Sequence, residues 1–193
     1  MINTVLFDMH GVILKDPHGN LEPFIRQTFP EMPREEIYKW WLKATVGELS
    51  SHDFFHNLGY VNPAEAERAC LDTIEVDEAF YGVAEQLRKH CKLALVTNEI
   101  FEWADYICAK FDLRRYFDLV VISGEVGVKK PDPRIFELVL NRLAVRAEEC
   151  VFIDDMTRQL AGAVEVGIHT IHYKGAPGEH LTAGSLAELR WLS

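Results

Sequence analysis

Four short, uninterrupted apolar runs constrain the fold of this chain more than any other feature of its sequence. The runs are Val5–Phe7, Leu93–Val96, Leu119–Ile122 and Val151–Ile153, and residues 168–172 form a candidate fifth strand. Such runs, bounded by polar residues, are typical of strands covered on both faces, as in a parallel sheet. Helical patterns at residues 99–110, 133–143 and 157–165 each follow one of these runs. The alternation predicts an α/β fold with a doubly wound, Rossmann-like parallel sheet.

Residues 15 to about 85 differ, because they contain helix-start signals and no convincing strand. The signals are Pro33 before a group of acidic residues, Ser51 before His52 and Asp53, and the Asn62-Pro63 pair. Ser or Asn ahead of a first turn that carries Pro and acids is typical of a helix N-terminus. We therefore expect a helical domain, residues 15–85, inserted into an α/β core domain made of residues 1–14 and 86–193.

The charge balance narrows the class of partner. The chain has 20 Lys and Arg against 30 Asp and Glu, a net charge of −10 with His neutral. A nucleic-acid groove needs a basic stripe, so we expect neither nucleic-acid binding nor a polybasic membrane contact. No run of 18 apolar residues occurs, and residues 1–14 resemble a strand rather than a signal peptide. The four cysteines have no metal-like or redox-like spacing and are expected to be reduced thiols. These features predict a cytoplasmic protein.

Polar residues that could take part in catalysis or bind a metal follow the apolar runs. They are Asp8 and His10 after the first run, Thr97-Asn98 after the second, Lys129-Lys130 in the loop after the third, and Asp154-Asp155 after the fourth. Ligands of open α/β sheets gather at the carboxyl ends of the strands, so these residues are predicted to converge. Taken one at a time, each has a structural alternative as a turn former, a helix cap or a solvated charge.

The combination favours phosphoryl chemistry. Paired carboxylates with other oxygen ligands suit Mg²⁺, which also binds substrate phosphate. A carboxylate can attack phosphorus and form an aspartyl-phosphate. The transferred phosphoryl group then needs positive charge and hydrogen-bond donors, which lysine, a threonine hydroxyl and backbone amides supply.

Four segments resemble motifs I to IV of the haloacid dehalogenase (HAD) superfamily, in the same order and over essentially the whole chain. They are Phe7-Asp8-Met9-His10-Gly11-Val12, Val96-Thr97-Asn98, Gly127-Val128-Lys129-Lys130-Pro131-Asp132-Pro133 and Phe152-Ile153-Asp154-Asp155. The helical insertion resembles the small C1-type cap of the subgroup that contains sugar-phosphate phosphatases, phosphomutases and dehalogenases. Within it, Gly47-Glu48-Leu49-Ser50 and Phe54-Phe55 resemble a recurring cap segment.

The resemblance implies a role for each matched residue. Asp8 would be the nucleophile and a metal ligand, and Thr97 would hold the phosphoryl group with Asn98 close by. Lys130 would neutralise the nucleophile and the phosphate, with Lys129 as a less favoured substitute. Asp155 would bind Mg²⁺, Asp154 would bind it directly or through water, and the backbone carbonyl of His10 would complete the site.

His10 departs from the family pattern. Phosphatases of this family normally carry a second Asp two residues after the nucleophile, which protonates the leaving group and then activates water. Three interpretations stay open: His10 is the working acid and base, since imidazole is competent for both roles; it marks a slow enzyme or a related chemistry; or it marks a protein that has lost catalysis.

Two related chemistries are weighed against phosphate hydrolysis. Dehalogenases of the family use the same Asp nucleophile without metal, but they usually carry Tyr at position 10 and lack the acidic pair of motif IV. Phosphonate hydrolases tolerate a residue other than Asp but need a cap lysine, for which Lys39 and Lys43 are weak candidates.

The sequence therefore predicts Mg²⁺-dependent hydrolysis of a small, sugar-phosphate-like phosphomonoester through an aspartyl-phosphate on Asp8. The alternative is a catalytically weak or inactive relative that binds a phospho-ligand or a partner, or a dehalogenase-type or phosphonatase-type hydrolase.

Overall fold

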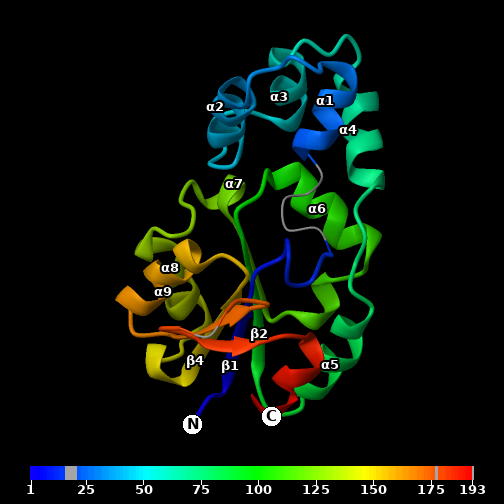
Figure 1. The fold of residues 1–193 in the computed structure, drawn as a ribbon. Helices are drawn as coiled ribbons and strands as arrows, with labels where there is room; N and C mark the ends of the chain where they lie inside the picture. Colours follow the sequence, from blue (N-terminus) through cyan, green and yellow to red (C-terminus); the bar gives the residue numbers. More distant parts are fainter. Residues whose placement is uncertain (16–20, 177, 193) are drawn as a thin grey trace.

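The computed structural model describes residues 1–15, 21–176 and 178–192, which form a parallel sheet with helices on both faces (Figure 1). The strands are β1 (Thr4–Phe7), β2 (Lys92–Thr97), β3 (Leu119–Ile122), β4 (Cys150–Asp154), β5 (His169–Tyr173) and β6 (Leu181–Ala183). The sheet order is β3-β2-β1-β4-β5-β6, and every pair of neighbours is parallel. The predicted α/β fold and its five strands are confirmed, whereas β6 was not expected.

Both faces of the sheet are covered, as the uninterrupted apolar runs require. On β1, Val5 and Phe7 belong to one buried apolar cluster, and Leu6 between them belongs to another. The first cluster includes side chains of α5 (Ala79–Leu87) and α6 (Phe101–Lys110), and the second includes those of α8 (Pro133–Leu143) and α9 (Thr157–Glu165). Because successive side chains of a strand point to opposite faces, a doubly covered strand turns neither set of side chains to solvent.

Four helices follow β1 and lie over the carboxyl ends of the strands (Figure 1). They are α1 (Leu21–Thr28), α2 (Arg34–Ala44), α3 (Ser51–Asn57) and α4 (Pro63–Asp72), and we call them the helical insertion. Pro63 opens α4 as expected, whereas the cap of α3 is Ser50 rather than Ser51: the Ser50 hydroxyl accepts a hydrogen bond from the Asp53 amide at 3.1 Å, and Ser51 is the first residue of the helix. The division of the chain at residues 14/15 and 85/86, and the cap type, stay predictions.

The shorter elements connect the core. They are α7 (Ser123–Val126) and the 3₁₀ turns at Arg114–Tyr116, Ala147–Glu149 and Leu186–Leu192. All four cysteines are buried and free. In the described ranges of the chain, none of the helices is both long and apolar enough to cross a lipid bilayer.

Candidate active site

Three carboxylates meet where β1 and β4 end. These strands are neighbours in register, with Phe7 opposite Ile153, so the residues that follow come out side by side. Oxygens of Asp8, Asp154 and Asp155 all lie within 4.8 Å of one another, and they form the one His, Cys, Asp or Glu group in the described residues that is placed to hold a metal. The predicted convergence of these carboxylates is confirmed. His52 and His56 stack on each other in the insertion and belong to no such group.

Gly11 makes room for this cluster. Its φ is +76°, a conformation that glycine adopts without strain, and a Cβ there would overlap the carboxylate of Asp155. The loop after β1 can therefore pass directly behind Asp155 only because residue 11 has no side chain.

Lys130 lies between two of the carboxylates. Its Nζ is 2.6 Å from Oδ1 of Asp8 and 2.8 Å from Oδ2 of Asp154, and the residue is 2% exposed. Burial alone would lower the pKa of this ammonium, but Asp154 and Asp8 outweigh burial and raise the pKa above its usual value. Lys130 is therefore a fixed positive charge beside the Asp8 carboxylate.

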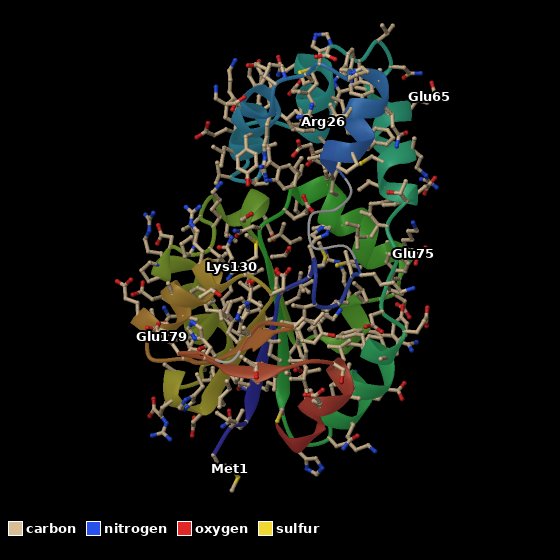
Figure 2. The ribbon with its side chains drawn as sticks, viewed as in Figure 1. Met1, Arg26, Glu65, Glu75, Lys130 and Glu179 are labelled. Carbon is tan, nitrogen blue, oxygen red and sulfur yellow. The ribbon has the colours of Figure 1, made fainter. Side chains whose placement is uncertain are left out.

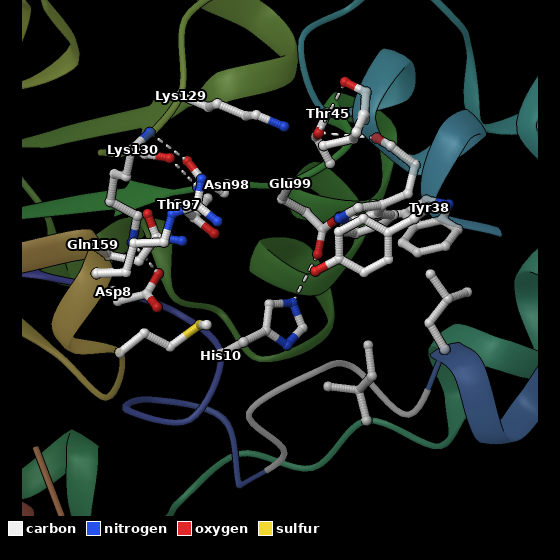
Figure 3. Close-up of a pocket in the computed structure, with 17 residues that line it drawn as sticks. Asp8, His10, Tyr38, Thr45, Thr97, Asn98, Glu99, Lys129, Lys130 and Gln159 are labelled. Carbon is white, nitrogen blue, oxygen red and sulfur yellow. Dashed lines mark hydrogen bonds and ion pairs between the residues drawn. The ribbon is translucent and has the colours of Figure 1, made fainter. Parts of the chain in front are cut away.

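Asn98 positions Lys130 through the backbone. The Asn98 amide donates to the Lys130 carbonyl at 2.9 Å and accepts from the Lys130 amide at 2.8 Å (Figure 3). The Asn98 side chain thus joins the end of β2 to the loop that carries the lysine, which the sequence did not indicate.

Asp154 is fully buried, and both of its oxygens are engaged. Oδ2 pairs with Lys130, and Oδ1 accepts a hydrogen bond from the Met156 amide at 2.8 Å. Burial, together with the nearby charge of Asp8, raises the pKa of Asp154 to about 6, against the opposing effect of Lys130. Asp8 and Asp155 are therefore better placed than Asp154 to give an oxygen directly to a cation.

Thr97 brings a hydroxyl to the same place. It ends β2 and is buried, and its Oγ1 has no hydrogen-bond partner among the described residues. A buried polar atom without a partner is costly unless a ligand satisfies it. Thr97 and Asp8 line the same pocket, so this hydroxyl is available to a bound anion.

His10 is paired with Glu99, a residue that sequence reasoning treated only as a helix start. His10 Nε2 lies 2.7 Å from Glu99 Oε2, and Glu99 is 1% exposed (Figure 3). The backbone holds Glu99 in turn, because the Ile100 amide donates to its Oε1 at 2.8 Å. Helix α6 begins two residues later than predicted, at Phe101, so Glu99 lies in the loop next to Thr97-Asn98. The only feature of the sequence that could have identified Glu99 as a site residue is its position directly after Thr97-Asn98.

Most of these side chains, though not those of Asp154 and Asp155, line one cavity of about 210 Å³ between the sheet and the helical insertion. The core contributes Asp8, His10, Thr97, Asn98, Glu99, Trp103, Lys129, Lys130, Met156, Arg158 and Gln159, and the segment from residue 21 to residue 74 contributes Leu21, Tyr38, Trp41, Leu42, Thr45 and Ile74. Figure 2 shows the labelled Lys130 inside the core, below the helical insertion. The predicted site residues other than Asp154 and Asp155 thus share a cavity, and these two belong with Asp8 to the adjoining carboxylate cluster.

Two more cations face this cavity. Lys129 and Arg158 both line it, and neither forms an ion pair with a described carboxylate. Burial, with the charge of Arg158, lowers the pKa of Lys129. With Lys130, three cations line the cavity, against the carboxylates of Asp8 and Glu99, so an anionic ligand meets positively charged groups there.

The insertion lysines weighed for a phosphonatase do not line the cavity. Lys39 donates to Glu36 at 3.1 Å and lies over the Trp40 ring, 4.3 Å from its centroid. Lys43 also lies over that ring, at 5.4 Å. Neither is among the lining residues, so the described insertion brings no amine to Asp8.

Known proteins with similar sequences indicate the family to which this site belongs. The family model for haloacid dehalogenase-like hydrolases matches residues 2–167. The phosphorylated carbohydrates phosphatase of Thermotoga maritima is 28% identical over 89% of this chain and 84% of its own length. Acyl-CoA dehydrogenase family member 10 of Mus musculus is 30% identical over 87% of this chain, and the chain spans only 17% of that protein's length.

Solved structures share the fold. A HAD family enzyme of Bacteroides thetaiotaomicron, crystallised with magnesium and inorganic phosphate, superposes with a TM-score of 0.78 at 22% identity, covering 93% of this chain and 98% of that one. A HAD phosphatase of Thermococcus onnurineus gives a TM-score of 0.74 at 25% identity, covering 99% and 97%. Because the family model covers most of the chain and the motif residues converge, this chain belongs to the haloacid dehalogenase-like hydrolases.

Proposed function

We propose that this chain is a Mg²⁺-dependent phosphatase that hydrolyses a small phosphomonoester through an aspartyl-phosphate on Asp8. The observation that carries the proposal is the position of the Asp8 carboxylate, which lies in a cavity beside Lys130, within 4.8 Å of Asp154 and Asp155. A nucleophile, a fixed cation and a set of hard oxygen ligands are together what phosphoryl transfer needs.

The donor set fits magnesium. Asp8 and Asp155 would hold the ion, with the His10 carbonyl as a further ligand, while Asp154 would keep Lys130 in place and orient the site. Carboxylates are the ligands that this hard cation prefers. When bound, the ion supplies positive charge to the phosphoryl oxygens. The Bacteroides relative crystallised with magnesium and phosphate supports this assignment.

The proposed reaction has two steps on Asp8. An oxygen of its carboxylate attacks phosphorus as the bond to the leaving oxygen breaks, while Lys130 and the Thr97 hydroxyl hold the phosphoryl oxygens. Water then attacks the aspartyl-phosphate, which releases inorganic phosphate and restores the Asp8 carboxylate.

The leaving oxygen needs a proton, and the pair formed by His10 and Glu99 is placed to provide it. In the acid role, Nε2 of His10 would carry the hydrogen that it shares with Glu99, and Nδ1 of the doubly protonated imidazole would give its proton to the leaving oxygen, which leaves a neutral ring. Both residues line the cavity. We infer that the two together occupy the functional place of the second Asp of related phosphatases, with Glu99 fixing the orientation of the imidazole.

The first test is Mg²⁺-dependent phosphate release by wild type, Asp8→Asn and the matched control Asp105→Asn. Asp105 is exposed and pairs with Arg114 on the surface. We expect Asp8→Asn to lose activity by about 10³-fold or more, since the nucleophile is gone, and Asp105→Asn to retain it. No release by wild type from aryl phosphates or metabolite phosphates between pH 5 and 9 would favour the phospho-ligand-binding alternative.

A second test addresses the proton donor. Glu99→Gln and His10→Asn are each expected to lower kcat by about 10²–10⁴-fold, the usual contribution of a general acid. The effect of both changes together should be smaller than the product of the two. If His10→Asp instead raises turnover strongly, His10 is a handicap and the chain is a slow enzyme.

A further inference from the structure

One face of helix α2 forms a wall of the cavity. Tyr38, Trp41, Leu42 and Thr45 all line the cavity, and their spacing of three, four and seven residues puts them on one side of a helix. Figure 3 shows Tyr38 and Thr45 on the opposite side of the cavity from Asp8. The leaving group of a substrate held at Asp8 therefore meets this face.

The wall is apolar and largely aromatic. Leu21, Ile74 and Trp103 extend it, and no described residue of the helical insertion brings a charged side chain to the cavity. The Thr45 hydroxyl is already used, because it donates to the Trp41 carbonyl at 2.9 Å. The other polar atoms of the wall side chains are the Tyr38 hydroxyl and the indole N–H groups of Trp41 and Trp103, so a polyhydroxylated group would lose water here and find few partners, which is unfavourable.

Two residues of the wall have exposed apolar surface that a bound ligand would cover. Tyr38 is 49% exposed and Leu42 is 45% exposed, whereas Trp41 packs on Trp103 with 5.7 Å between ring centroids. The wall thus has a rigid aromatic base and two open apolar side chains. Covering open apolar surface is favourable, and aromatic rings add offset or edge contacts.

We propose that the substrate is a phosphate ester whose leaving group is an apolar body of about one ring, rather than a sugar. This inference rests on the proposed function and deepens it. The size follows from the cavity of about 210 Å³, because an apolar cavity of about 150 Å³ holds one benzene molecule and the remainder is left for the phosphoryl group. The charged side, with Lys129, Lys130 and Arg158, receives the phosphoryl group.

The test compares phosphate esters of primary alcohols, so that differences in leaving-group reactivity stay small. Benzyl phosphate and cyclohexylmethyl phosphate are measured against glycerol 3-phosphate and glucose 6-phosphate, with Mg²⁺ and wild-type protein. We expect kcat/KM to be about 10- to 100-fold higher for the two apolar esters, the range that a hydrophobic pocket can supply. Equal or higher values for the polyol and sugar esters would overturn this inference and leave the proposed function standing.

A binding measurement separates the two proposals. The affinities of 2-phenylethylphosphonate and a glycerol-derived phosphonate, which cannot be hydrolysed, are compared by quenching of tryptophan fluorescence and by calorimetry. Tighter binding of the phenyl compound supports the apolar wall, whether or not any ester is hydrolysed. The absence of hydrolysis would count only against the proposed function. Equal affinity overturns the apolar wall.

Variants of α2 test whether this helix causes the preference for apolar esters. Tyr38→Ser and Leu42→Ser are expected to reduce the ratio of benzyl to glycerol ester kcat/KM by about tenfold each. The control is Val61→Ser, because Val61 is fully exposed in the helical insertion and does not line the cavity. A ratio that changes no more in Tyr38→Ser and Leu42→Ser than in Val61→Ser would contradict the assignment of the wall.

Discussion

The Nε2 atom of His10 lies 2.7 Å from Oε2 of Glu99, and the two residues are 89 positions apart in the chain. The first sits in the loop after β1, and the second sits in the loop after β2. These strands are neighbours in the sheet, so the loops at their carboxyl ends are adjacent. The residue that departs from the family pattern thus has a buried acidic partner supplied by the next strand.

Lys130→Met is expected to destabilise the protein as well as abolish hydrolysis. The change leaves Asp8 and Asp154 close together without their shared cation, and breaking a buried ion pair from one side costs about 3–5 kcal/mol. Urea unfolding measures the loss, and added Mg²⁺ should recover part of it. Lys129→Met is the control, because no described carboxylate pairs with Lys129. Equal losses in both variants would contradict this account.

Thr97→Val should separate stability from function. Valine has the shape of threonine without the buried hydroxyl that lacks a described partner, so the free energy of unfolding should stay the same or rise by up to about 1 kcal/mol. The value of kcat/KM should fall by about 10- to 100-fold, because one phosphoryl contact is lost. Thr97→Ser keeps the hydroxyl and should retain most activity. A Thr97→Val protein that is fully active would remove Thr97 from the site.

Gly11→Ala and Gly127→Ala form a matched pair. Both glycines have positive φ, +76° and +74°, so alanine pays a similar backbone cost of about 1–2 kcal/mol at each. Only at Gly11 would the new Cβ overlap the carboxylate of Asp155, and nothing lies within 4 Å of it at Gly127. We expect Gly11→Ala alone to weaken Mg²⁺ binding, measured by calorimetry. The same Mg²⁺ affinity in both variants would show that the Asp155 position does not matter.

Alkaline pH should destabilise the fold through two thiols. Burial raises the pKa of Cys108 and of Cys150 to about 11. A group whose pKa is raised on folding stabilises the protein fully below its unfolded pKa, near 9, and loses that contribution as pH rises through the folded value. Between pH 9 and 11 we therefore expect a loss of up to about 2–3 kcal/mol per thiol.

Urea unfolding at pH 8 and pH 10.5 checks this expectation. The double variant Cys108→Ala/Cys150→Ala is the comparison, because it removes both titrating groups. It should be less stable at pH 8, since each change leaves a small cavity, yet lose less stability on going to pH 10.5. The same alkaline loss in both proteins would assign the effect to other groups.

The pattern of apolar runs was enough to predict the sheet and the edge where the chemistry lies. A strand covered on both faces leaves a local signature, and the loops at its carboxyl end follow from the parallel topology. The meeting of Asp8, Thr97, Lys130 and Asp154 could therefore be predicted from the sequence. Elements without such a signature were missed, including the three-residue strand β6 and helix α1.

Only the tertiary structure showed which partner each site residue binds. It pairs His10 with Glu99, uses the Asn98 amide to hold the Lys130 backbone, and engages both oxygens of Asp154. These partners are set by distance in space between loops of different strands, and hydrophobic periodicity carries no information about them. The apolar face of α2 that lines the cavity could not be predicted either. An amphipathic pattern indicates that one side of a helix is buried, but it does not indicate which part of the protein or which ligand packs against that side.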